Sequence, residues 1–241
     1  MIEKEISIRS NDVQLSGTIC LPKETGRFPA VLMIHGSGPL DRDENMKAQQ
    51  LNVFNTIAHH LAKEGFASLR YDKRGCGKSG GNFYKTGHFD LVEDVVNAFD
   101  ALSQMEFCEK VFVLGHSEGC IIAPQVSLKR TSIAGLILLC PFADTIESVL
   151  MKQAAQLEKE FEHSGFFSKM LSNILGANVK SQRKLIDSIN SSNAESMRNH
   201  FQKVPAKSFR ELMSLDPRSI FSQVTQPMLI IGGEKDLQCE P

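Results

Sequence analysis

Residues 110–130 read KVFVLGHSEGCIIAPQVSLKR, and this stretch sets the interpretation of the whole chain. A continuously apolar run ends at Gly115, the pentapeptide GHSEG follows, and residues suited to a helix come next. A G-x-S-x-G sequence between a strand and a helix forms a sharp turn that lifts the serine hydroxyl clear of the sheet. Larger side chains at positions 115 and 119 would collide in such a turn. Ser117 is therefore predicted to be a nucleophile; a chance glycine-rich turn is the alternative.

The apolar segments on either side of this stretch predict a parallel sheet. Strands are expected at residues 29–36, 66–71, 110–115, 133–140 and 227–233, and each is apolar throughout, as in strands covered on both faces. Helical spacing fills the first two connections, over residues 54–61 and 92–102. We expect a doubly wound, mostly parallel α/β fold. Two alternating segments, residues 4–10 and 13–21, are expected to add an antiparallel edge.

The connection over residues 143–217 interrupts this alternation. It carries two amphipathic stripes, at residues 146–161 and 166–174. A connection this long with its own helices favours an inserted lid over a loop. The predicted domains are thus a first core part (1–142), a helical lid insertion (143–217) and a second core part (218–241).

An oxyanion formed by attack of Ser117 needs hydrogen-bond donors. The backbone N–H of Glu118 opens the predicted helix and is one candidate. The loop IHGSGPLDRD, residues 34–43, follows the first parallel strand, and its Ser37 N–H is the second candidate; a plain Gly/Pro turn is the alternative. His35 lies at the strand exit and is disfavoured as a base.

Four motifs carry a resemblance to a known family: HGSGPLDRD, RYDKRGCGKS, GHSEG and GGEKD. Their order and spacing resemble the α/β-hydrolase superfamily, and most closely its small serine esterase branch of dienelactone-hydrolase-like and prolyl-oligopeptidase-like enzymes. The resemblance implies a structural role for the second motif, through Asp72 and Arg74. Two departures are Cys120, where many relatives carry glycine, and the residues LQCEP after the acid.

Asp236 follows the last apolar strand and is the expected acid of a catalytic triad, with Glu234 as a weaker competitor. Triad order in this fold places the histidine after the acid, yet no histidine follows His200. We expect a truncated chain that lacks the last strand and helix, with weak activity or none. His163 and His200 in the lid are the candidates for a substitute base.

Composition and short motifs exclude several classes of function. A net charge of −1, a pI near 6.7 and the absence of tryptophan disfavour nucleic acid and anionic membrane. The six cysteines form no C-x-x-C pair, and the N-terminus has no apolar signal region, which favours a cytoplasmic protein. GCGKSG opens into no helix, so a dinucleotide fingerprint and a phosphate loop are rejected. The adjacent His59 and His60 cannot share a helix face, and neither a metal nor a cofactor is expected.

The predicted activity is a serine hydrolase of carboxylic esters with short or medium acyl groups, thioesters included. In it Ser117 attacks, Ser37 and Glu118 N–H groups hold the oxyanion, and Asp236 orients a histidine absent from this chain. The partner is a small-molecule ester, and the oligomeric state is left open. The alternative from another class is a non-catalytic relative that binds an acyl or ester-like ligand or a protein.

Overall fold

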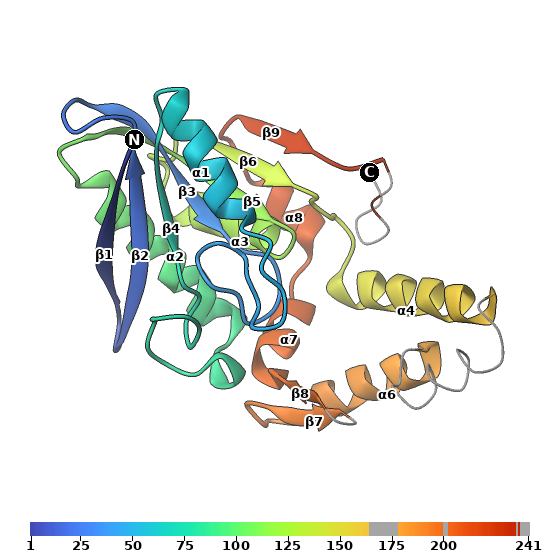
Figure 1. Cartoon of the computed structure of the whole chain (residues 1–241). Helices are drawn as coiled ribbons and strands as arrows, with labels where there is room; N and C mark the ends of the chain where they lie inside the picture. Colours follow the sequence, from blue (N-terminus) through green and yellow to red (C-terminus); the bar gives the residue numbers. More distant parts are fainter. Residues whose placement is uncertain (164–177, 200–201, 235, 237–241) are drawn as a thin grey trace.

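The computed structural model describes residues 1–163, 178–199, 202–234 and 236, and side chains within 161–163 are left undescribed. Its centre is a seven-stranded sheet in the order β1-β2-β4-β3-β5-β6-β9 (Figure 1). The first two strands pair antiparallel, β2 pairs antiparallel with β4, and all further neighbours are parallel. The strands are β1 (Ile2–Ser10), β2 (Val13–Leu21), β3 (Phe28–Ile34), β4 (Ala67–Tyr71), β5 (Cys108–His116), β6 (Gly135–Leu139) and β9 (Met228–Ile231). The predicted mostly parallel α/β sheet with an antiparallel edge is confirmed.

Alternate residues of the central strands enter two different cores. In β3, Ala30 and Leu32 pack into the larger core, whereas Val31 and Met33 pack into the smaller one. Successive side chains of a strand point to opposite faces of the sheet, so a strand covered on both faces must be apolar at every position. This arrangement explains the continuous apolar runs of the sequence.

Helices cover the two faces of the sheet. The smaller core includes residues of α1 (Val53–Lys63), and the helices that contribute to the larger core are α2 (His88–Ser103) and α3 (Gly119–Lys129). A short 3₁₀ turn, η1 (Phe83–Lys85), precedes α2, and α8 (Pro217–Ser222) contacts α3. The site-bearing strand β5 therefore lies inside the sheet, between β3 and β6, with helices on both sides.

The segment 143–217 contains more than the helices that the sequence predicted. Its helices are α4 (Ile146–His163), α6 (Val179–Asn190) and α7 (Ala206–Met213). A two-stranded antiparallel hairpin, β7 (Met197–Asn199) with β8 (Gln202–Val204), also forms and was not predicted from the sequence. Three-residue strands are too short to show a period in the sequence. The stripe at residues 166–174 lies outside the described residues.

The same segment reaches away from the sheet and also returns to it. In Figure 1, α4 and α6 extend to one side of the molecule, while α7 lies under the core. The contacts of α7 are with α2, η1, α4 and α6. Residues of α7 therefore pack beside α2 and η1, which are distant from α7 in sequence.

The strand β9 forms one edge of the sheet within the described residues. Its four apolar residues are 40–59% exposed, in contrast to the buried residues of β3 and β5.

Among the helices that the structure describes, none combines the length and apolar character needed to cross a bilayer.

The loop of residues 70–79 has the structural role that the resemblance implied. The Asp72 carboxylate accepts hydrogen bonds from the backbone N–H groups of Arg42 and Lys78 and forms an ion pair with the Arg42 guanidinium. Arg74 forms a buried ion pair with Asp94 of α2. Buried charges are tolerated when they are paired and hydrogen-bonded in this way.

Candidate active site

Ser117 lies in a strained turn between β5 and α3. Its φ is +50°, a left-handed conformation that residues other than glycine adopt rarely, and its N–H donates to the Leu139 carbonyl at 3.0 Å. A Cβ atom added at Gly115 would lie 2.3 Å from the Gly119 carbonyl oxygen. Glycine is therefore required at 115 for the steric reason that the sequence pattern indicated.

Two backbone N–H groups beside Ser117 have no hydrogen-bond partner among the described residues. Within the hydrogen bonds of the described residues, neither the Ser37 N–H nor the Glu118 N–H is used. Glu118 immediately precedes α3, where the helix dipole favours negative charge. Both N–H groups are thus available to a ligand oxygen, and their role in binding an oxyanion stays a prediction.

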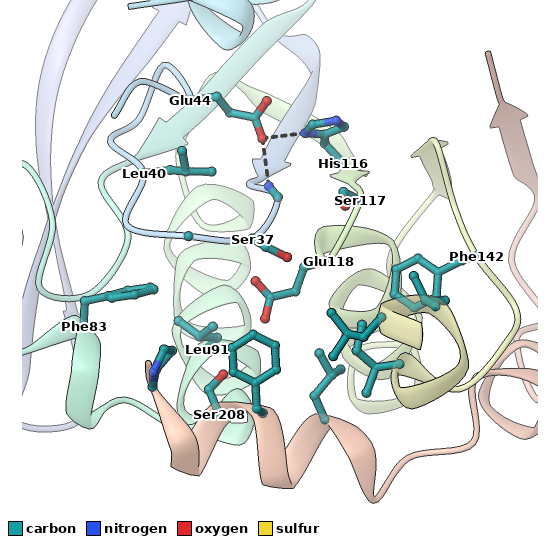
Figure 2. Close-up of a pocket in the computed structure, with 18 of the residues that line it drawn as sticks. Ser37, Leu40, Glu44, Phe83, Leu91, His116, Ser117, Glu118, Phe142 and Ser208 are labelled. Carbon is teal, nitrogen blue, oxygen red and sulfur yellow. Dashed lines mark hydrogen bonds and ion pairs between the residues drawn. The ribbon is translucent and has the colours of Figure 1, made fainter. Parts of the chain in front are cut away.

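Ser37, Ser117 and Glu118 line one cavity of about 540 Å³. Figure 2 shows these three residues close together, with the Glu118 carboxylate directed into the cavity and Ser208 of α7 across from it. Most of the wall is apolar and comes from six segments: the 36–51 loop, η1, α2, the loop after β6, α4 and α7. Its apolar members are Leu40, Met46, Leu51, Phe83, Leu91, Phe142, Ile146, Val149, Leu150, Phe209 and Leu212.

A buried carboxylate ties the Ser37 loop to the serine turn. Glu44 Oε1 lies 2.8 Å from His116 Nδ1 and accepts a hydrogen bond from the Gly36 N–H at 2.8 Å (Figure 2). Burial alone would raise the pKa of Glu44, but hydrogen bonding to His116 and Gly36 outweighs it and the pKa is lowered. The hydrogen bond to Glu44 raises the pKa of His116, against the opposing effect of burial. Glu44 thus holds the Ser37 loop and the Ser117 turn in place relative to each other.

This pair predicts a pH-dependent stability. The raised pKa of His116 gives a contribution that is complete below about pH 6.5 and is lost as pH rises through that raised pKa. The Glu44 contribution is present above about pH 4.5 and is lost as pH falls through its lowered pKa. Thermal unfolding should show His116→Asn destabilised by ~1 kcal/mol at pH 6, with a smaller gap at pH 9.

The matched control for that measurement is His60→Asn, at an exposed position on α1. It should leave the melting temperature unchanged at both pH values. An equal gap between the His116 variant and the parent at pH 6 and pH 9 would contradict a charged pair.

Asp236, the expected acid, lies near the serine turn. It is half-buried, and its carboxylate contributes to the raised pKa of His116, which directly precedes Ser117. Burial first, and then Asp236, raise the pKa of the Cys140 thiol at the end of β6. Asp236 and Ser117 thus both lie beyond the carboxyl ends of the parallel strands, although Asp236 does not line the cavity. Glu234 is exposed.

None of the histidines whose side chains are described hydrogen-bonds Ser117. The His35 ring is buried and contacts the Tyr71 carbonyl at 2.5 Å, and burial lowers its pKa to about 4. His88 is buried against Gln125, and His59 pairs with Glu3. The side chain of His163 and all of His200 lie outside the described residues.

One group among the described residues has three potential metal-binding atoms near one another: Glu3, Cys20 and His59. The Arg70 guanidinium lies 2.7 Å from the Glu3 carboxylate, and its positive charge would repel a cation there. Cys20, Cys76, Cys108 and Cys120 are buried, and Cys140 is half-buried. Cys239 lies outside the described residues.

Two functional residues were missed by sequence reasoning. Glu44 follows a charged stretch, and nothing in its local pattern distinguishes it from a solvated acid. Phe209 of α7 lines the cavity although it is far from the motifs in sequence. Helical spacing could have shown an apolar face on α7, but not what that face contacts.

Comparisons with known proteins show what the chain is similar to. Residues 47–241 match the family model Hydrolase_4, described as serine aminopeptidase, S33. Esterase EstD of Thermotoga maritima is 32% identical over 237 residues, which cover 98% of this chain and 52% of EstD. The chain thus spans about half the length of that relative.

Solved structures with the same fold include Est1E and an esterase, Pf2001. Est1E from Butyrivibrio proteoclasticus, solved with ferulic acid bound, superposes with a TM-score of 0.67 at 20% identity, over 98% of this chain and 81% of Est1E. Esterase Pf2001 of Pyrococcus furiosus superposes with a TM-score of 0.63 at 20% identity, over 99% of this chain and 72% of Pf2001.

Proposed function

Because this chain belongs to the serine aminopeptidase S33 family of α/β hydrolases, we propose that it hydrolyses carboxylic esters by nucleophilic attack of Ser117. The observation that carries the proposal is the geometry at one point. A strained serine and two unengaged backbone N–H groups face the same cavity. The relation to EstD, a named esterase, supports an ester as the substrate.

In the proposed reaction, Ser117 Oγ attacks the carbonyl carbon while a histidine takes the hydroxyl proton. The carbonyl oxygen becomes an oxyanion and accepts hydrogen bonds from the Ser37 and Glu118 N–H groups. The tetrahedral intermediate expels the alcohol, which receives the proton from the histidine, and an acyl-serine remains. Water, deprotonated by the same histidine, then releases the acid. Asp236 orients the histidine, and the scheme uses no cofactor.

The histidine of this scheme is not among the described residues. With no described histidine at Ser117 we expect slow hydrolysis, because a triad without its base keeps only the rate enhancement due to the oxyanion site and substrate binding. Added imidazole is small enough to act as the base. It should stimulate hydrolysis by the 241-residue chain.

The cavity indicates the class of acyl group. Its volume of about 540 Å³ lies within the range of roughly 300–1,000 Å³ usual for small-molecule sites. The wall away from Ser117 is apolar, with Val149 of α4 and Leu212 of α7 both buried there. We infer a short or medium acyl chain, in an oxygen ester or a thioester. In this account residues 143–217 form a lid over the core built by residues 1–142 and 218–241.

A cavity-filling substitution tests this assignment. Val149→Trp should reduce kcat/KM for p-nitrophenyl octanoate at least ~10-fold, because the indole takes the space of the chain. The acetate ester should be affected less than about twofold. The measurement is a series of acetyl, butyryl, hexanoyl and octanoyl esters, with imidazole present. An alanine nitroanilide, assayed alongside, tests the aminopeptidase activity that the family description names.

The matched control is Leu157→Trp, an exposed position on the same helix that lies outside the cavity. It should leave the whole ester series unchanged. A Val149→Trp effect independent of chain length would contradict the acyl assignment. Cleavage of the anilide in preference to every ester would contradict the proposed substrate class.

The absence of a described histidine at Ser117 favours one second candidate, a non-catalytic protein that binds an acyl or ester-like ligand. This candidate predicts that octanoate binds the chain, which a change in the protein's spectrum would report. It also predicts that no ester is hydrolysed, even with imidazole. The ester series therefore separates the two candidates.

A further inference from the structure

Lys73 places a positive charge directly behind the candidate oxyanion site. Its side chain is 3% exposed, and it follows β4 on the loop of residues 70–79. An ammonium group buried to this extent is costly unless it is hydrogen-bonded. The Lys73 ammonium donates hydrogen bonds to the Gly36 carbonyl oxygen at 2.6 Å and to the Glu118 carboxylate at 3.4 Å. Both partners belong to the two segments that supply the free N–H groups.

We propose that Lys73 is a positioning residue that aims and polarises the Ser37 N–H toward the substrate oxygen; this inference rests on the proposed function. The Gly36 carbonyl and the Ser37 N–H belong to one peptide unit. In a trans peptide they point in opposite directions within one plane, and no cis bond occurs among the described residues. A donor that holds the carbonyl from behind therefore fixes the direction of the N–H in front.

The hydrogen bond from Lys73 to the Gly36 carbonyl also makes the Ser37 N–H a stronger hydrogen-bond donor. A charged donor at 2.6 Å polarises the carbonyl, and polarisation passes through the conjugated amide to the N–H. The other side of Gly36 is held as well, because its own N–H donates to Glu44 at 2.8 Å. There is little room for a side chain at position 36, because an added Cβ would lie 3.1 Å from His116 Nδ1. The peptide is thus fixed from both sides before any substrate binds.

The ion pair with Glu118 connects Lys73 to the second donor. Glu118 is 7% exposed and supplies the N–H beside Ser117. One ammonium therefore links the two segments that carry the oxyanion donors. Lys73 does not itself line the cavity, so it acts through Gly36 and Glu118 and not on the substrate.

The test compares Lys73→Met with Lys78→Met. Lys78 lies on the same loop, but its side chain is 73% exposed and pairs only with the exposed Glu5. For p-nitrophenyl butyrate with imidazole present, Lys73→Met should lower kcat roughly 10-fold or more, with KM changed less than about twofold. Lys78→Met should change neither constant. The double variant Lys73→Met with Glu118→Gln removes both buried charges, and it should fold as stably as the parent while keeping the low kcat.

A second measurement does not depend on turnover. In the parent, the Gly36 carbonyl ¹³C and Ser37 amide ¹H resonances should both lie downfield of their positions in Lys73→Met, and they should not move in Lys78→Met. Unchanged resonances at these two atoms would overturn the inference, whether or not the chain hydrolyses esters. Moved resonances with an unchanged kcat would overturn it too. If no protein in the series hydrolyses an ester, the proposed function fails, and the resonances alone decide the role of Lys73.

Discussion

Replacing Ser117 by alanine is expected to remove ester hydrolysis down to the buffer rate, a fall of roughly 10³-fold or more once a base is present. The reason is that Ser117 is the one hydroxyl-bearing residue among the described residues of the cavity wall that lies on a strained turn, with a φ of +50°. The measurement is the initial rate on p-nitrophenyl butyrate with saturating imidazole. Imidazole also cleaves such esters by itself, and the alanine variant provides that background.

Ser103→Ala, at the exposed end of α2, is the matched control and should keep the parent rate. Equal rates for the parent and Ser117→Ala, with imidazole present, would show that the observed hydrolysis does not pass through this serine.

The second large effect is expected at Gly119, where α3 begins. An added Cβ would lie 2.5 Å from the Ile34 carbonyl oxygen and 2.9 Å from that of His35. Both contacts are to backbone of the β3 end, which cannot rotate away. Gly119→Ala should therefore push α3 from the sheet, with a loss of about 3 kcal/mol of stability or more. Hydrolysis should fall roughly 10²-fold or more, because the Glu118 N–H moves with the helix.

Urea unfolding and the same ester assay check this prediction. Gly80→Ala is the control, because an added Cβ there meets its nearest atom at 3.5 Å and the backbone has no positive φ. A Gly119→Ala protein as stable and as active as the parent would mean that the serine turn tolerates a wider separation of helix and strand.

Much of the fold followed from the sequence because apolar runs and helical spacing record burial directly. The expected strand at residues 133–140 is β6 (Gly135–Leu139), and the stripe beginning at residue 146 is α4 (Ile146–His163). Boundaries differed by a few residues where a strand continued past its apolar run, as at Cys108 of β5. The hairpin of β7 and β8 was missed because three-residue strands have no period to detect.

The site was predictable where chemistry fixes local geometry and not where it depends on distant contacts. Ser117 and the flanking glycines are specified by one tight turn, so a pentapeptide reveals them. Glu44 contacts His116, which lies 72 positions later in the sequence. Lys73 contacts Gly36, which lies 37 positions earlier. Only the packing of the loops after β3 and β4 against the serine turn brings these groups together. Asp236 was placed by motif order, and its role remains a proposal.

The most direct measurement of the central claim is the intact mass of the chain after mixing with p-nitrophenyl butyrate. No histidine among the described residues hydrogen-bonds Ser117, so we expect slow acylation and still slower deacylation, and the acyl-serine should accumulate. We predict a mass increase of one butyryl group, located by peptide mapping at Ser117 and absent from Ser117→Ala. An unmodified chain, or a butyryl group on a lysine or cysteine that persists in Ser117→Ala, would contradict the account.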